Sequence, residues 1–379
     1  MSEFVVHGEC SPQFRRVRAA FIENFENRGE VGGAVAIYVD GELVVDLWGG
    51  QLVHDQRPVE PWQRHTIVRM MSVNKAMTAI CAHRLVDQGL LDYDRRVADY
   101  WPEFAQAGKQ GITVRMLLAA LAGVIYPDGV PDGKVLDWTA MVDGLAKTKP
   151  MWEPGTRGAY HSSTYGHLVG ELVRRTTGKL PGVYFREEIG DPLNIDYWFS
   201  LPQSEFSRVS ELLPNPHSTT LDAIAKADTP LARAWRILPS IETFYRDEPK
   251  ILDREMPSAF GRGNARSVAK VFGALARGGI VDGHRVLSPD AIDAMTTMYW
   301  DDNCGLTGRR FRYCMGVYKN MPGRQPMGPN SEAFGHLGAG GSFVFADPAA
   351  KLAFSYCTNF MCIGEGCGDR CEALVEAIF

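Results

Sequence analysis

The chain has 379 residues, of which 45% are hydrophobic and 22% charged, which is enough to bury a large core in more than one lobe. No run reaches 18 apolar residues, so we expect no membrane span. The formal net charge of -5, without a basic run interleaved with aromatic residues, argues against a nucleic-acid partner.

The first part of the chain predicts a helix followed by a β-hairpin. Residues 11–28 carry apolar side chains at the spacing of one helix face. Those side chains are Phe14, Val17, Phe21 and Phe25. The segments GAVAIYV and ELVVDLW flank Asp40-Gly41, a dipeptide typical of a tight hairpin. The opening residues lack the basic and apolar regions of a secretory signal, so we expect a cytoplasmic protein.

The middle of the chain predicts helices, and its end predicts strands again. A long helical segment over residues 72–88 is closed by Gly89, and helical stretches separated by proline and glycine follow to about residue 260. A further helix is expected over 265–276. The runs SFVFAD and KLAFSYCTN, separated by Pro348-Ala349-Ala350, predict a second hairpin, and a short helix follows.

Strands at both ends with helices between them predict an α/β (α+β) fold. We expect one central antiparallel sheet, built from both chain ends and flanked by helices, with a largely helical second lobe. The expected lobes are residues 1–70 with 261–379, and residues 71–260. An active site is expected at their interface.

Eight cysteines are expected to be reduced thiols. Four of them lie in CTNFMCIGEGCGDRC, which contains Cys362, Cys367 and Cys371. The spacings are x4, x4 and x3 rather than the C-x2-C pairs of zinc modules, and no histidine lies near them in the sequence. We therefore expect no metal, and thiols that pack as small apolar side chains.

The pattern S-x-x-K occurs twice, as Ser72–Lys75 in MMSVNKA and as Ser267–Lys270 in SVAK. Positions i and i+3 share a helix face, so the lysine can reach a serine hydroxyl at the helix start. The lysine accepts that proton only if burial or a second cation lowers its pKa. The alternative is an N-cap serine with a surface lysine, and the pattern alone leaves both interpretations open.

Two later segments carry further candidate residues. WEPGTRGAYHSSTYG places Tyr160 two residues before Ser162, and a tyrosine hydroxyl near a lysine can act as a base. The alternative is a half-buried aromatic residue with a solvated tip. In FGHLGAGGSFVFADP, His336 precedes glycines that permit close backbone approach and an N–H facing an oxyanion. The alternative is an ordinary hairpin with a solvent-facing histidine.

The order S-x-x-K, Y-x-[NS], [HKW]-x-G resembles the serine β-lactamase and penicillin-binding superfamily, above all its class C-like branch and the family VIII carboxylesterases. Four long segments also look like family VIII esterase sequences, and the resemblance covers roughly residues 10–375. These segments are GAVAIYVDGELVVDLWGG, YWPEFAQAGKQGITVRMLL, WEPGTRGAYHSSTYGHLVGELVRRTTG and FGHLGAGGSFVFADP.

The resemblance implies a role for each residue that matches the motifs. Ser72 would be the acylated nucleophile, Lys75 would take or shuttle its proton, and Tyr160 would be the general base that activates water. The backbone N–H groups of Ser72 and Ala339 would form the oxyanion hole.

His336, Gly338 and Ser162 would contact the substrate. Because the family places its serine before the tyrosine, Ser267 is expected to be a helix cap, with Lys270 on the outer face.

Two departures from the family pattern bear on the substrate. Ser162 replaces an asparagine, and His336 replaces the lysine that helps to bind the carboxylate of a β-lactam. A neutral imidazole binds anions more weakly than an ammonium group does, so both changes favour an uncharged ester. Ala120, where related sequences often have histidine, has no functional explanation.

The resemblance thus implies a serine carboxylesterase acting on short- to medium-chain esters, with weak β-lactam hydrolysis as a side activity. It implies no cofactor and a small-molecule ester as partner, and it leaves a homo-oligomer open. The alternatives are a β-lactamase or D-amino-acid peptidase, or a non-catalytic binding protein on the same fold. Residues 121–150 and 215–255 are expected to form the walls of the substrate pocket. Three aromatic residues of these segments either line an apolar pocket or belong to the core, namely Trp138, Trp235 and Tyr245.

Overall fold

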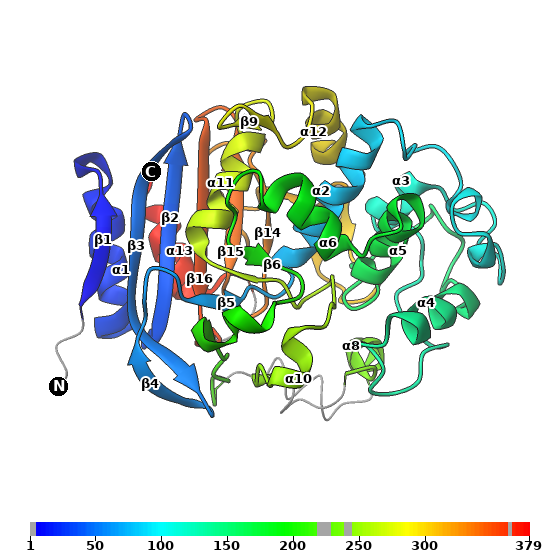
Figure 1. The fold of residues 1–379 in the computed structure, drawn as a ribbon. Helices are drawn as coiled ribbons and strands as arrows, with labels where there is room; N and C mark the ends of the chain where they lie inside the picture. The colour runs from blue at the N-terminus through cyan, green and yellow to red at the C-terminus, as the bar shows by residue number, and fades with distance from the viewer. Residues whose placement is uncertain (1–4, 218–228, 239–244, 363–365) are drawn as a thin grey trace.

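The computed structural model describes residues 5–217, 229–238, 245–362 and 366–379, and it contains a ten-stranded antiparallel sheet built from both ends of the chain (Figure 1). The order is β1-β3-β2-β16-β15-β14-β13-β12-β11, and β4 pairs with the end of β3. The strands are β1 (Val6–Cys10), β2 (Gly32–Val39), β3 (Glu42–His54), β4 (Arg57–Pro61), β11 (Trp300–Asn303), β12 (Arg310–Tyr313), β13 (Tyr318–Lys319), β14 (Phe334–Leu337), β15 (Phe343–Asp347) and β16 (Leu352–Thr358).

Both hairpins predicted from the sequence are confirmed. Val39 pairs with Glu42 across a two-residue turn in which Asp40 and Gly41 both have positive φ, at 50° and 91°. This backbone conformation suits a tight hairpin and explains why Asp-Gly occurs there. β15 and β16 pair antiparallel, as SFVFAD and KLAFSYCTN predict.

Helices cover both faces of this sheet, so its central strands are apolar on both sides. In β16, Leu352, Phe354 and Tyr356 face the helices α1 (Arg15–Asn27) and α13 (Gly368–Glu376). The alternate residues Ala353 and Cys357 face α11 (Ala265–Leu275) on the other side. Because side chains of a strand alternate between its faces, a buried strand of this kind is a continuous apolar run.

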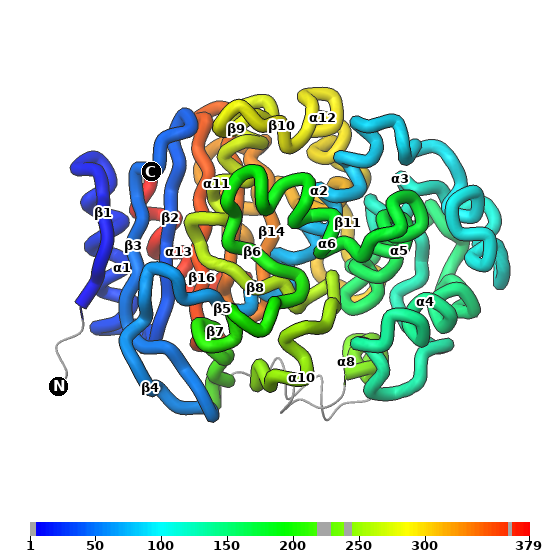
Figure 2. The backbone as a smooth tube through the Cα atoms, in the orientation of Figure 1, coloured from blue at the N-terminus to red at the C-terminus, as the bar shows by residue number. Residues whose placement is uncertain are grey.

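The predicted α+β arrangement is confirmed: the sheet and its covering helices lie at one side in Figures 1 and 2, and a mainly helical part lies at the other. The remaining helices are α2 (Val73–Asp87), α3 (Val114–Leu118), α4 (Trp138–Lys147), α5 (Tyr165–Thr177), α6 (Pro181–Phe185), α8 (Pro230–Trp235), α10 (Pro249–Leu252) and α12 (Pro289–Thr296). The lobe boundaries near residues 70 and 261 stay a prediction.

A second, four-stranded sheet contains the strand that precedes Ser72. Its order is β6-β8-β5-β7, and the pair β9-β10 stands apart. The strands are β5 (Ile67–Arg69), β6 (Tyr197–Trp198), β7 (Val209–Ser210), β8 (Arg262–Gly263), β9 (Ile280–Val281) and β10 (His284–Arg285). β5 ends three residues before Ser72, and α2, which starts directly after Ser72, is buried along almost its whole length.

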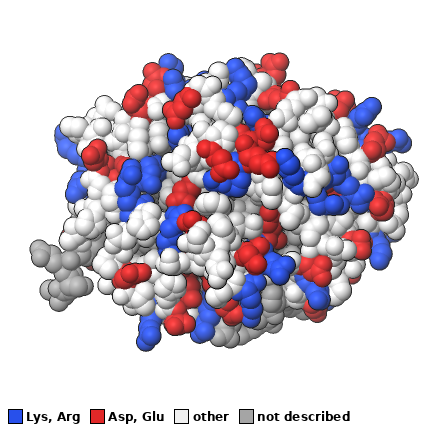
Figure 3. Space-filling model, in the orientation of Figure 1, with Lys and Arg blue, Asp and Glu red and all other residues white. Residues whose placement is uncertain are grey.

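Basic and acidic side chains are intermixed on the face of the molecule shown in Figure 3. Among the helices of the described residues, none combines the length and the apolar character needed to cross a bilayer.

Candidate active site

Ser72 lies on a strained turn between β5 and α2. The preceding residue, Met71, has φ of 52°, a left-handed conformation that is costly for a side chain of this size. Ser72 occupies the N-cap position, but its Oγ lies 3.0 Å from Lys75 Nζ rather than serving the helix end as a capping acceptor does. The turn therefore holds the hydroxyl against the lysine one helical turn ahead.

Lys75 is a buried amine in the middle of the molecule, with no exposed surface. Its Nζ lies 2.8 Å from the Ser258 carbonyl oxygen as well as 3.0 Å from Ser72 Oγ. Burial lowers the pKa of Lys75 well below its usual value, because a charge is costly away from water. The surface-lysine alternative is wrong, and this amine is suited to accept a proton.

Tyr160 completes the group, although it lies far from Ser72 in the sequence. Lys75 Nζ lies 4.9 Å from the centroid of the Tyr160 ring, and the Tyr318 ring lies 6.3 Å away between centroids. Burial raises the pKa of Tyr160 to about 12, while the neighbouring Ser72 and Tyr318 side chains lower it in part. The ring stacks on Phe311 with 5.6 Å between centroids, which fixes its orientation.

The turn between β14 and β15 approaches the Ser72 turn closely. A Cβ on Gly338 would lie 2.2 Å from the Met70 carbonyl oxygen, so only glycine fits there. The Gly338 N–H donates to the Ser342 carbonyl across 2.7 Å and closes this turn. Ala339, the expected second oxyanion donor, follows directly and is exposed.

His336 is buried, so the solvent-facing alternative is wrong. Its Nδ1 lies 2.8 Å from the Leu337 carbonyl oxygen, and a carbonyl can only accept, so Nδ1 carries the proton. Nε2 is buried without a hydrogen-bond partner among the described residues. Burial, and then the nearby Lys75, lower the pKa of His336 to about 3. The imidazole is therefore neutral, and its Nε2 is an acceptor only.

The other candidate wall residues divide into two groups. Ser162 Oγ accepts a hydrogen bond from Trp235 Nε1 across 2.8 Å, and the Ser162 N–H donates to the Tyr160 carbonyl across 2.9 Å. Trp138 instead donates to Glu171 across 2.9 Å and belongs to the packing of α4 on α5. Tyr245 is buried, and residues 218–228 and 239–244 of the expected wall lie outside the described residues.

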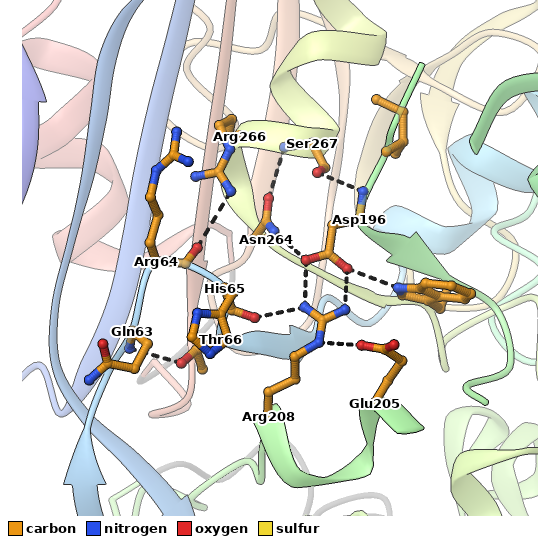
Figure 4. Close-up of polar contacts among 12 residues, drawn as sticks. Gln63, Arg64, His65, Thr66, Asp196, Glu205, Arg208, Asn264, Arg266 and Ser267 are labelled. Atoms are coloured by element: carbon orange, nitrogen blue, oxygen red, sulfur yellow. Dashed lines mark hydrogen bonds and ion pairs between the residues drawn. The ribbon is translucent and has the colours of Figure 1, made fainter. Parts of the chain in front are cut away.

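Ser267 is not a helix cap, which corrects the sequence prediction. The N-cap of α11 is Asn264, whose Oδ1 accepts from the Ser267 N–H across 3.0 Å (Figure 4). The Ser267 hydroxyl accepts from the Asp196 N–H across 2.9 Å. Lys270 is partly exposed, and its Nζ lies 2.6 Å from an Asp282 carboxylate oxygen. This second S-x-x-K therefore has a structural role, since its serine and lysine face different partners.

All eight cysteines are free, and seven of them are buried. Cys362 and Cys367 are buried beside the β14–β15 turn, where the Cys362 N–H donates to the Gly340 carbonyl across 3.0 Å. Cys371 packs with them on α13.

Two contacts of the site escaped sequence reasoning. The Ser258 carbonyl that accepts from Lys75 and the Tyr318 ring that lies near the Tyr160 ring both come from segments distant in the sequence. Ser258 Oγ also accepts from the Gly166 N–H across 2.8 Å and so ties this segment to the start of α5. No local pattern marks either residue.

Comparison with known proteins places these observations in a family. Residues 17–364 match the family model described as Beta-lactamase. The structure is similar to the crystal structure of a family VIII carboxylesterase, with 38% identity, 99% of both chains covered and a TM-score of 0.89. A penicillin-binding protein homolog from Caulobacter crescentus is 35% identical, with 98% of both chains covered and a TM-score of 0.87.

A third relative is the esterase/beta-lactamase LipL of Mycobacterium tuberculosis. It is 34% identical over 362 residues, which cover 93% of this chain and 83% of the relative. The match of the family model over most of the chain and the two similar structures agree with one another. This chain belongs to the beta-lactamase family.

Proposed function

We propose that this protein is a serine carboxylesterase that hydrolyses uncharged short- to medium-chain esters through an acyl-enzyme on Ser72. The observation that carries the proposal is the 3.0 Å contact between Ser72 Oγ and the Nζ of a fully buried lysine. A serine hydroxyl becomes a nucleophile when a base of suitable pKa lies within hydrogen-bond reach, and the lowered pKa of Lys75 supplies one.

In acylation, the neutral Lys75 amine takes the Ser72 proton as Oγ attacks the ester carbonyl. The backbone N–H groups of Ser72 and Ala339 receive the oxyanion. Loss of one such donor typically costs about 10²–10³ in rate. The resting Tyr160 is a phenol because its pKa is raised, and it passes its proton to the leaving alcohol oxygen.

After acylation, Lys75 is an ammonium and Tyr160 a phenolate. The ammonium 4.9 Å from the ring centroid favours that phenolate electrostatically. Tyr160 then takes a proton from water as the hydroxide attacks the acyl group, and Lys75 returns its proton to Ser72 Oγ. Both side chains regain their resting states, so the cycle balances.

The neutral His336 supports the preference for an uncharged ester. An acceptor-only imidazole offers no charge to a substrate carboxylate, which is the group that a β-lactam brings. Trp235 Nε1 donates to the Ser162 hydroxyl and so occupies one of its acceptor positions. A small-molecule ester as partner, a cytoplasmic location and a homo-oligomeric state stay predictions.

Weak β-lactam hydrolysis is a second candidate activity, because one relative carries both esterase and beta-lactamase in its name. Ring opening of a β-lactam also acylates a serine, so the same residues serve both reactions. Turnover of a chromogenic cephalosporin beside p-nitrophenyl butyrate separates the two. We expect the ester to turn over faster, and faster turnover of the cephalosporin contradicts the preference.

The test of the proposal is p-nitrophenyl ester hydrolysis by Ser72→Ala, with Ser267→Ala as matched control. Ser72→Ala is expected to lose activity to the background level. Ser267→Ala removes the hydroxyl of the other S-x-x-K and is expected to keep kcat, although it leaves the Asp196 N–H without its acceptor. That loss costs about 1–3 kcal/mol of stability, so both variants are assayed well below their melting temperatures. Undiminished activity of Ser72→Ala excludes the proposed nucleophile.

A further inference from the structure

Ser258 is a fully buried serine in a turn over residues 256–260, and its carbonyl oxygen contacts the amine of the site. Lys75 Nζ lies 2.8 Å from that oxygen and 3.0 Å from Ser72 Oγ. A carbonyl can only accept, so one N–H of Lys75 points at Ser258. With that N–H committed, the lone pair of the neutral amine is left for the Ser72 proton.

The Ser258 hydroxyl connects the 256–260 turn to the segment that carries Tyr160. It donates to the Ser163 carbonyl across 2.9 Å and accepts from the Gly166 N–H across 2.8 Å. Ser163 lies three residues after Tyr160, and Gly166 lies in the first turn of α5. One residue therefore binds the Tyr160 segment through its side chain and Lys75 through its main chain.

The 256–260 turn is also held by its backbone on two sides. A Cβ on Gly166 would lie 2.1 Å from the Ser258 nitrogen and 2.3 Å from the Pro257 carbonyl carbon, so the two backbones touch there. On the side of α2, Thr78 Oγ1 donates to the Pro257 carbonyl across 3.1 Å. The turn thus packs between α2 and the start of α5, and any change in its position moves the acceptor that Lys75 uses.

We propose that Ser258 is a positioning residue for the esterase reaction: its hydroxyl fixes the 256–260 turn to the segment that follows Tyr160, and its carbonyl holds the Lys75 amine against Ser72. The inference rests on the proposed function and deepens it, because it names the residue that keeps Lys75 and Tyr160 in one arrangement. Ser258 itself transfers no proton.

The test is Ser258→Ala, which removes the hydroxyl and keeps the carbonyl. With p-nitrophenyl butyrate we expect kcat/KM to fall about 10- to 100-fold, because a displacement of about 1 Å in a catalytic group can cost that much. KM should change little, since Lys75 acts in the chemical step.

The matched control is Ser210→Ala. Ser210 is equally buried, and its hydroxyl accepts from the Val53 N–H across 3.1 Å and donates to the Glu211 carbonyl across 3.2 Å. The control loses bonds of the same kind, none of them to the 256–260 turn or to residues 163–166. It should keep the wild-type kcat/KM.

The pH dependence of kcat/KM separates positioning from a merely structural loss. Its acid limb reports the protonation of Lys75, which must be neutral to accept the Ser72 proton. The Ser258 carbonyl binds an ammonium more strongly than an amine, so loosening it should lower the pKa of Lys75 and move the acid limb to lower pH by about 0.5–1 unit. A smaller folded fraction lowers kcat/KM without moving the limb. Between about pH 5 and pH 10 the other titratable groups near Lys75 stay neutral, and they are Tyr160, His161 and His336.

Two outcomes overturn the inference: an acid limb that stays in place in Ser258→Ala, or one that moves equally in Ser210→Ala. Thr78→Val removes the other hydroxyl that binds the 256–260 turn and keeps the shape of the side chain. It should move the acid limb in the same direction, and it is judged by the same two outcomes if Ser258→Ala does not fold.

If the wild-type protein hydrolyses no ester, the proposed function fails instead, and urea unfolding as a function of pH decides on Ser258. An unfolded lysine has a pKa of about 10.4. The folded pKa of Lys75 lies well below its usual value because of burial, so the free energy of unfolding rises with pH between the two values. The part of that rise that vanishes in Lys75→Met should begin at lower pH in Ser258→Ala than in Ser210→Ala. An equal onset in both rejects the inference.

Discussion

Asp247 is a buried carboxylate that binds two arginines where strand β5 leads towards the nucleophile. Arg69 of β5 and Arg262 of β8 are direct cross-strand partners, and both are fully buried. Asp247 Oδ1 lies 2.8 Å from Arg69 Nη2 and 2.5 Å from Arg262 Nη2. Because β5 ends at Arg69, three residues before Ser72, this ion cluster lies close to the active site along the chain.

We predict that Asp247→Asn lowers the free energy of unfolding by about 3–5 kcal/mol, because breaking a buried ion pair leaves an uncompensated charge. Here two guanidinium groups would stay side by side, and Asp247 itself has almost no exposed surface, so solvent offers little screening. The exposed pair between Arg96 and Asp99, 2.8 Å apart, gives the comparison. Asp99→Asn should cost at most about 1 kcal/mol.

The assay is urea unfolding of the two variants and the wild type, followed by ester hydrolysis under folded conditions. A second change, Arg262→Met in the Asp247→Asn background, should recover part of the loss, because it removes one of the two buried guanidinium charges that lose Asp247. A loss for Asp247→Asn no larger than that for Asp99→Asn refutes the reasoning.

The pH dependence of unfolding gives an independent check on Asp247. Burial alone would raise the pKa of Asp247, but Arg262 and Arg69 outweigh it and hold the pKa below its usual value. The stability that this carboxylate contributes is therefore complete above its unfolded pKa, and it is lost as the pH falls through the lower folded pKa. Asp247→Asn should remove that part of the acid sensitivity.

Three further predictions follow from the site. Gly338→Ala places a Cβ 2.2 Å from the Met70 carbonyl oxygen and should abolish most activity, whereas Gly111→Ala, with open space around its Cβ, should not; equal activities contradict the close approach. The kcat/KM profile should show no step from His336 between pH 5 and 8, because its pKa lies at about 3; a step that vanishes in His336→Gln contradicts this. Dialysis against EDTA should leave kcat unchanged, since every proposed step uses the chain's own groups, and a loss restored by a divalent cation contradicts it.

Much of the fold follows from local patterns in the sequence. Helical spacing in residues 11–28 predicts α1, whose residues Val17 and Phe21 are fully buried against the sheet. The dipeptide Asp40-Gly41 predicts the β2–β3 hairpin because few residues accept positive φ. The sequence of β16 does not show which residues face which side of the sheet. Helices cover both faces, so the strand is an unbroken apolar run without alternating polar residues.

The site was predictable to a smaller extent. The pattern S-x-x-K places Lys75 beside Ser72 by helix geometry alone, but whether the amine is buried depends on the packing around α2. The helix start at Asn264 had a signal that was missed, since asparagine is a favoured N-cap three residues before Ser267. Tyr318 had none, because its contact with Tyr160 exists only through the pairing of strands distant in the sequence.

The central claim is that the Ser72 hydroxyl attacks an ester and carries the acyl group. The most direct measurement is mass spectrometry of peptides from protein that is mixed with p-nitrophenyl butyrate and quenched in acid within the first turnovers. The account predicts a butyryl mass on Ser72 that is absent in Ser72→Ala and unaffected by Ser267→Ala. Release of nitrophenol with the acyl group on another residue, or with none on the protein, contradicts it.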